Sequence, residues 1–130
     1  MSLIKVTPDR ERIKSILEMT NLIQKRINIL DKAEFSSLII VDYYEIIKEL
    51  ITAFLLLNGY KSLSHIELIS YLKKNCSDFT RGEIDLIDRL RIFRNRISYE
   101  GFGVPNFYLK ENEGSYLKII FKLRGLIKDE

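Results

Sequence analysis

Residues 80–103 read TRGEIDLIDRLRIFRNRISYEGFG, and they carry the clearest helix signal in the chain. Thr80 and Glu83 have the spacing of a capping box, in which each side chain accepts a backbone N–H that the first helical turn leaves unpaired. Gly101 and Gly103 mark the end, because glycine readily adopts the left-handed conformation that closes many helices. The segment therefore predicts one helix with a defined start and a defined end.

Two rows of side chains follow this helix. The first is an apolar stripe that predicts a core face, and it consists of Leu86, Leu90, Phe93 and Ile97. The second lies roughly on the other side and consists of Asp88, Ile92, Asn95 and Tyr99. A helix that meets only a core and water has no need of large apolar groups away from its core stripe. The second face is therefore expected to meet a twin subunit or a ligand.

The composition is that of one globular domain over residues 1–130, with 46% hydrophobic and 30% charged residues. The net charge of +3 is too small to indicate nucleic acid by itself. Cys76 is the only cysteine, so a disulfide framework is not expected. The chain begins without the apolar run of a signal peptide, and acids and lysines interrupt its apolar stretches. A cytoplasmic location and no membrane span are expected.

The rest of the chain also predicts helices. Thr7 is the expected N-cap and Pro8 the first residue of a helix over residues 8–30. A second, very apolar helix is expected over residues 36–57, and a third from a capping box at Ser64 to about residue 75. A last helix begins near residue 106, and Gly114 is a place where it could be split. The fold class is all-α, an up-and-down antiparallel bundle of four to five helices.

Three segments narrow the choice of function: RNRISYEG at residues 94–101, YYEIIKEL at residues 43–50 and LNGYKSLSH at residues 57–65. Together they resemble the HEPN superfamily of small helical-bundle proteins, in an archaeal-looking form. The resemblance extends from about residue 13 to residue 127. It implies a homodimer, with no metal and no cofactor.

Many members of this superfamily are metal-independent ribonucleases of toxin–antitoxin and defence systems. Others are non-catalytic and bind nucleotides, RNA or a partner nucleotidyltransferase. The catalytic signature is an arginine, a polar neighbour and a histidine a few residues later, near a cleft between two subunits. Carried over, Arg94 is the arginine, Asn95 is the neighbour, and the histidine position falls on Tyr99. In toxins regulated by adenylylation a tyrosine follows two residues later, and here that position is Gly101.

The missing imidazole matters for chemistry. Cleavage of RNA through the 2′-hydroxyl needs a base and an acid, and imidazole serves as both near neutral pH. A phenol, with a pKa of about 10, is mostly protonated there and is a poor base. Arg94 could still bind a phosphate through paired hydrogen bonds. Alternatively, Arg94 forms an ion pair with Asp88 or Glu83, and Tyr99 packs at a dimer contact.

The candidate residues fall into three overlapping groups. Ligand binding is assigned to Arg91, Arg94, Asn95 and Tyr99. A variant catalytic site would use Arg94, Asn95 and Tyr99. A subunit contact is assigned to Ile84, Asp88, Ile92 and Tyr99. His65, the only histidine, is expected to cap its helix locally or to face solvent; it reaches the site only if the third helix starts near the cleft. No metal site is expected.

Three functions follow from these residues. The first is a non-catalytic homodimer that binds RNA, a nucleotide phosphate or a partner protein near residues 94–99. The second is a metal-independent endoribonuclease of toxin or defence type with a variant site. The third is a helical partner of a small nucleotidyltransferase.

Overall fold

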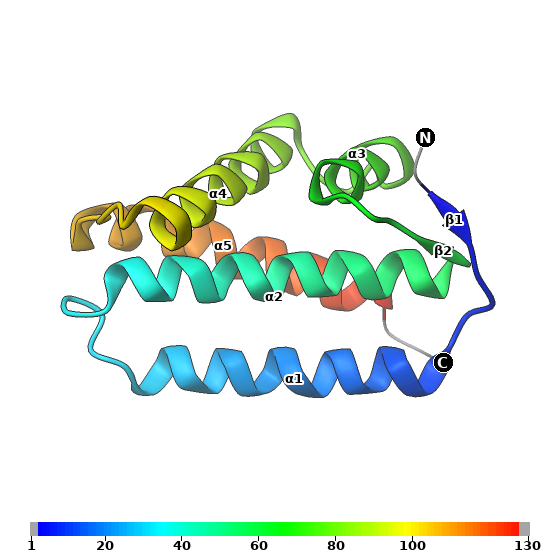
Figure 1. Cartoon of the computed structure of the whole chain (residues 1–130), viewed down its shortest axis with the longest axis horizontal. Helices are drawn as coiled ribbons and strands as arrows, with labels where there is room; N and C mark the ends of the chain where they lie inside the picture. Colours follow the sequence, from blue (N-terminus) through cyan, green and yellow to red (C-terminus); the bar gives the residue numbers. More distant parts are fainter. Residues whose placement is uncertain (1–2, 128–130) are drawn as a thin grey trace.

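A computed structural model describes residues 3–127 of the protein (Figure 1). This part of the chain has five helices: α1 Arg10–Ile29, α2 Ser36–Leu57, α3 His65–Asn75, α4 Arg81–Glu100 and α5 Asn106–Ile127. Two short strands, β1 Ile4–Lys5 and β2 Tyr60–Lys61, pair in antiparallel fashion. The predicted all-α bundle is confirmed. Within residues 3–127 no helix is both long and apolar enough to cross a lipid bilayer.

Helix α2 forms the centre of the bundle. It packs against α1, α3, α4 and α5, and 14 of its 22 residues are buried. A helix that is apolar nearly all round is stable in water only when neighbours cover it on most sides. Its composition therefore dictates an arrangement in which the other four helices surround it, as Figure 1 shows.

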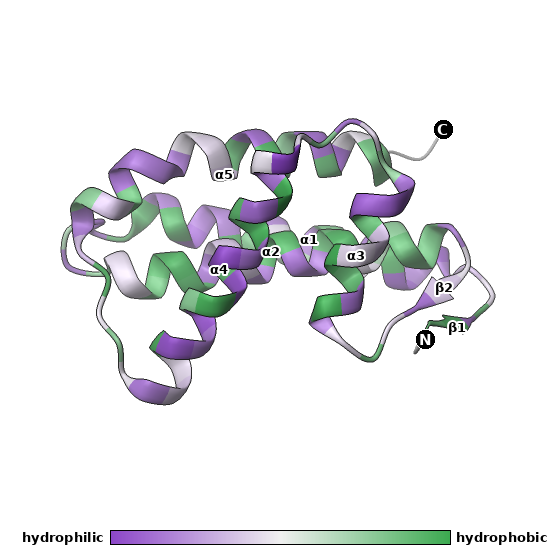
Figure 2. Ribbon diagram, turned by 90° about the horizontal axis from the view of Figure 1, so that it is seen from above, coloured by the Kyte–Doolittle hydropathy of each residue, from purple (hydrophilic) through white to green (hydrophobic). Residues whose placement is uncertain are grey.

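The helices on the two sides of α2 run in opposite directions. Helix α1 is antiparallel to α2, and Arg26 donates two hydrogen bonds to the Asp42 carboxylate, at 3.0 and 2.7 Å. Helix α5 runs in the same direction as α2, because α3 and α4 return the chain to the end at which α2 begins. Ser36 Oγ donates to the Val104 carbonyl at 2.7 Å, which joins the start of α2 to the residues before α5. Helices α3 and α4 lie next to each other across this layer (Figure 2).

Most helix ends agree with those predicted from the sequence. The capping box of α4 is present, with Thr80 Oγ1 accepting the Glu83 N–H at 3.1 Å and Glu83 Oε1 accepting the Thr80 N–H at 2.9 Å. Gly101 closes α4 with a φ of 67°. Helix α5 continues unbroken through Gly114.

The predicted start of the first helix was wrong. Its N-cap is Asp9, which accepts the Arg12 N–H at 3.1 Å, and neither Thr7 nor Pro8 belongs to the cap or the helix. The Val6 N–H donates to the Gly59 carbonyl at 2.9 Å and continues the contact between β1 and β2. This contact keeps the residues before Asp9 extended. The helix therefore begins after Asp9, the next residue that can serve as an N-cap.

The core face of α4 is wider than predicted. Leu86 and Leu90 are buried as expected, but Ile87 is also fully buried and Ile84 is only 7% exposed. Ile84 therefore belongs to the core of the single chain, and its assignment to a second, outer face was wrong. The reason is that α3 packs on α4 as well as on α2, so the first half of α4 is covered over a larger arc.

The capping box gives a direct test of how much this helix start contributes to stability. We expect Thr80→Ala to lower the free energy of unfolding by about 1 kcal/mol, because the Glu83 N–H loses its acceptor. Thr80→Ser keeps a hydroxyl and should stay close to the original protein. Urea unfolding measures both, and equal midpoints for the alanine and serine variants would contradict this role.

Candidate functional site

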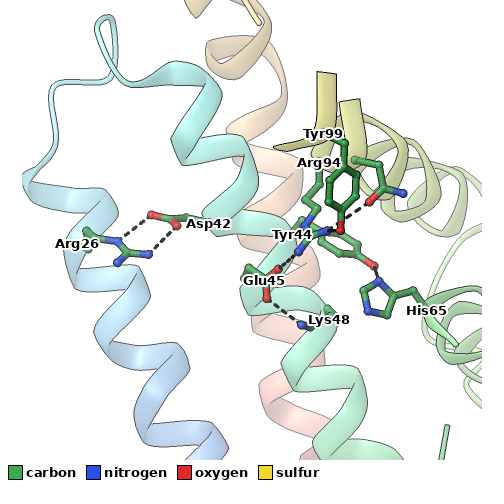
Figure 3. A network of polar contacts seen from close by, with 9 residues as sticks. Arg26, Asp42, Tyr44, Glu45, Lys48, His65, Arg94 and Tyr99 are labelled. Atoms are coloured by element: carbon green, nitrogen blue, oxygen red, sulfur yellow. Dashed lines mark hydrogen bonds and ion pairs between the residues drawn. The ribbon is translucent and has the colours of Figure 1, made fainter. Parts of the chain in front are cut away.

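A cluster of polar side chains lies where α2, α3 and α4 meet (Figure 3). We call it the Arg94 cluster, and it consists of Tyr44, Glu45 and Lys48 from α2, His65 from α3, and Arg91, Arg94, Asn95 and Tyr99 from α4. Three of the sequence-predicted residues, Arg94, Asn95 and Tyr99, are in direct contact within it. Glu45, Lys48 and Tyr44 were not predicted as site residues.

Arg94 is held in place from three directions. Its Nη1 donates to the Tyr99 hydroxyl at 3.0 Å and to Asn95 Oδ1 at 3.4 Å, and its Nη2 donates to Glu45 Oε1 at 3.3 Å. Burial disfavours the charge, but the hydrogen bond to Tyr99 and the carboxylate of Glu45 outweigh it and raise the pKa of Arg94. The side chain of Arg94, charged and oriented by these contacts, is 20% exposed.

The ion pairs differ from the expected ones. Arg94 pairs with Glu45 on α2, whereas Asp88 pairs with Arg91 at 3.0 Å and Glu83 pairs with Lys122 at 2.7 Å. Asp88 and Arg91 are three residues apart on one helix, a spacing that brings side chains together. Arg94 points away from that pair and toward α2, so its partner comes from a distant part of the sequence.

Glu45 connects two cations. Its Oε1 accepts from Arg94, and its Oε2 lies 2.8 Å from Nζ of Lys48. The Glu45 carboxylate is half-buried between α2 and α4. Among residues 3–127 no group of three or more His, Cys, Asp or Glu side chains could hold a metal ion.

His65 lies at this cluster as well. It is the first residue of α3, and its Nδ1 is 3.0 Å from the Tyr44 hydroxyl. Burial, together with the charges of Lys48, Arg94 and Arg91, lowers the pKa of His65, while Glu45 opposes the shift. Burial also raises the pKa of Tyr44 to about 12, so this phenol keeps its proton and can donate it to the ring.

The expected local role of His65 was therefore wrong. The only imidazole of the chain contacts α2 beside Arg94, although 29 residues separate the two in the sequence. The placement of His65 results from the tight turn after α2, where Gly59 adopts a φ of 85° and β2 pairs with β1. No local pattern around His65 could have revealed that placement.

The remaining candidates of α4 are at the surface. Tyr99 is 75% exposed, and its ring centre is 5.6 Å from the guanidinium carbon of Arg94. Ile92 is also exposed, and Asp88 and Asn95 are half-buried. The second row of α4 thus lies at or near the surface, whereas Ile84, which was assigned with it to a subunit contact, is buried.

Positive charge exceeds negative charge at this site. Lys48, Arg91 and Arg94 are cations, and the carboxylates paired with them are Glu45 and Asp88. One positive charge is left without an acid in these pairs, and His65 would add another if it were protonated. A partly exposed group of cations with such an excess attracts anions.

A separate hollow of about 490 Å³ lies between the β1–β2 pair and α3. Its lining residues are Leu3, Lys5, Tyr60, Glu67, Ser70, Tyr71, Lys74 and Asn75. None of them belongs to the Arg94 cluster. The cluster is defined by its charges and hydrogen bonds and not by a deep cavity.

Comparisons of the chain with models of protein families, with curated proteins and with solved structures give no match. The similarity to the HEPN superfamily therefore stays a prediction that rests on the three segments quoted above.

The lowered pKa of His65 predicts how stability depends on pH. The unfolded chain takes up a proton at this side chain near the ordinary pKa of 6.5, whereas the folded ring stays neutral to lower pH. The unfolded state then binds more protons, so stability should fall as pH decreases through this window and level off below the folded pKa.

The control for this prediction is His65→Gln, which cannot titrate. Urea unfolding at about pH 7.5 and about pH 5.5 should show a larger loss of stability in the original protein than in the variant. An equal loss in both proteins would mean that His65 has its ordinary pKa in the folded state.

Proposed function

We propose that the Arg94 cluster binds a phosphate group of RNA or of a nucleotide, without catalysing a reaction. This proposal rests on the convergence of Lys48, Arg91 and Arg94. The two carboxylates that pair with these cations, Glu45 and Asp88, leave an excess of positive charge. A guanidinium whose orientation is already fixed loses less conformational entropy when it binds a phosphate.

Glu45 sets a limit on that affinity. Its carboxylate occupies one edge of the Arg94 guanidinium, which a phosphate oxygen would have to share or take over. The exposed Tyr99 ring beside it offers a flat surface on which a base can stack. The site thus supplies a cation for the phosphate and an aromatic ring for the base.

Two substitutions with opposite effects test this function. Arg94→Gln should weaken binding of a short single-stranded RNA about tenfold or more, because the bound phosphate loses a charged hydrogen-bond donor. Glu45→Gln should strengthen binding, because a competing carboxylate is removed. Fluorescence anisotropy at two salt concentrations measures both, and binding should weaken as salt rises.

Arg96→Gln is the matched control. Arg96 lies on the same helix, but its guanidinium stacks 3.9 Å from the Phe102 ring centre and it is outside the cluster. Binding that falls equally in the Arg96 and Arg94 variants would indicate general charge attraction and not a site at Arg94.

A ribonuclease is the second candidate, and the position of His65 favours it. The cluster contains an imidazole, which belongs to His65 on α3. It does not come from the signature histidine position, where this chain has Tyr99. The chain offers one histidine, however, and its Nδ1 is occupied by the Tyr44 hydroxyl. Cleavage needs both a base and an acid, and a ring with a lowered pKa is a poor acid at neutral pH.

We therefore expect no cleavage of single-stranded RNA by the purified protein in EDTA. The assay compares the original chain with His65→Gln and Arg94→Gln under identical conditions. Cleavage that disappears in His65→Gln, while RNA binding persists, would replace the binding function with the ribonuclease.

A further inference from the structure

Helix α5 carries an apolar row on the side that faces away from the core. Phe121 is 80% exposed and Phe107 is 64% exposed, and Leu117 beside them is exposed too. The buried residues of α5 lie on the opposite side of the helix and include Leu109, Tyr116, Ile120 and Leu123. None of the Arg94 cluster comes from α5.

The row has a regular spacing. Phe107, Gly114 and Phe121 follow one another at intervals of seven residues. Seven residues are close to two turns, so the three positions lie within about 40° of arc, and each phenylalanine is about 10.5 Å along the axis from Gly114. The two rings therefore stand symmetrically on either side of a position that has no side chain.

The fold of the single chain does not require glycine at that position. A Cβ added to Gly114 would meet nothing within 4 Å, and Gly114 has a φ that is not positive. Glycine inside a helix costs about 0.5–1 kcal/mol relative to alanine, so a compensating reason is expected. Close approach of another backbone is such a reason.

A second copy of the same helix fits this row. In an antiparallel pair centred on Gly114, the two glycines face each other, and Phe107 of each copy meets Phe121 of the other. In such a two-fold symmetric contact, each pair of residues occurs twice. Four aromatic rings that are exposed in the single chain would then be covered.

The charges beside the row match the same arrangement. Glu111 and Lys118 lie on one flank of the row, at nearly equal distances along the helix from Gly114. In the antiparallel pair Glu111 of each copy lies opposite Lys118 of the other. Both side chains are exposed, and neither forms an ion pair within residues 3–127.

We infer that a second copy of this chain docks on the outer face of α5, antiparallel, with its two-fold axis at Gly114. The contact consists of the Phe107–Phe121 pairs and the Glu111–Lys118 pairs. The outer face of α4 then stays open, so the dimer and the phosphate site are independent. The sequence-based expectation placed the subunit contact on α4 instead.

Charge reversal tests the pairing without touching the core. Light scattering should give twice the 15.3 kDa mass for the original chain. Glu111→Lys and Lys118→Glu should each weaken the dimer about tenfold, because two attractive contacts become repulsive. The double variant exchanges the charges and should recover the original dissociation constant, and failure to recover it would overturn the antiparallel pairing.

A cysteine placed on the axis locates the contact directly. Gly114→Cys should form a disulfide-linked dimer under mild oxidation, whereas Ser115→Cys, one residue further round the same helix, should not. The natural Cys76 is buried and remains in both proteins. Equal cross-linking of the two variants would contradict an axis at Gly114.

The alternative contact on α4 gives a different result. Phe121→Glu should produce a monomer, and Ile92→Glu should leave the dimer intact, since both replace exposed side chains with the same charge. A dimer that survives Phe121→Glu and dissociates in Ile92→Glu would move the contact to α4. A monomer for the original chain at micromolar concentration would remove the inference altogether.

Discussion

Burial of α2 is the constraint on which the rest of the structure depends. The helix is apolar on almost every side, so α1 and α5 lie along it and the α3–α4 pair lies across it. The few polar groups of α2 must then find partners among those neighbours, because an unpaired charge loses its solvation when it is covered. Glu45 is the clearest case, since a half-buried carboxylate requires cations and obtains them from Lys48 and Arg94.

The same constraint brings the chemical groups together. Tyr44 is buried in the α2 core, and its hydroxyl holds His65 at the start of α3. Arg94 reaches α2 from the other side, where Glu45 and Tyr99 fix its orientation. The hydrogen bonds between the three helices orient these side chains without a ligand, and the excess of positive charge gives the site a preference for anions.

The sequence was sufficient for features that depend on neighbours along the chain. The capping box at Thr80 and the continuous apolar helix α2 follow from local spacing. The ion-pair partner of Arg94 and the hydrogen-bond partner of His65 come from distant segments, so the spacing of residues along one helix could not predict either contact. Ile84 was misplaced for a related reason, because the arc of α4 that is buried depends on where α3 packs.

Phosphate binding at Arg94 can be observed at a single side chain, because His65 is the only histidine and its ring gives unambiguous NMR signals. Titration with a short single-stranded RNA should shift these signals, since the phosphate would change the charge around Arg94, Lys48 and His65. The shift should be saturable and should be lost in Arg94→Gln. Ring signals that do not move during the titration, in a protein that still binds the RNA, would show that binding occurs elsewhere.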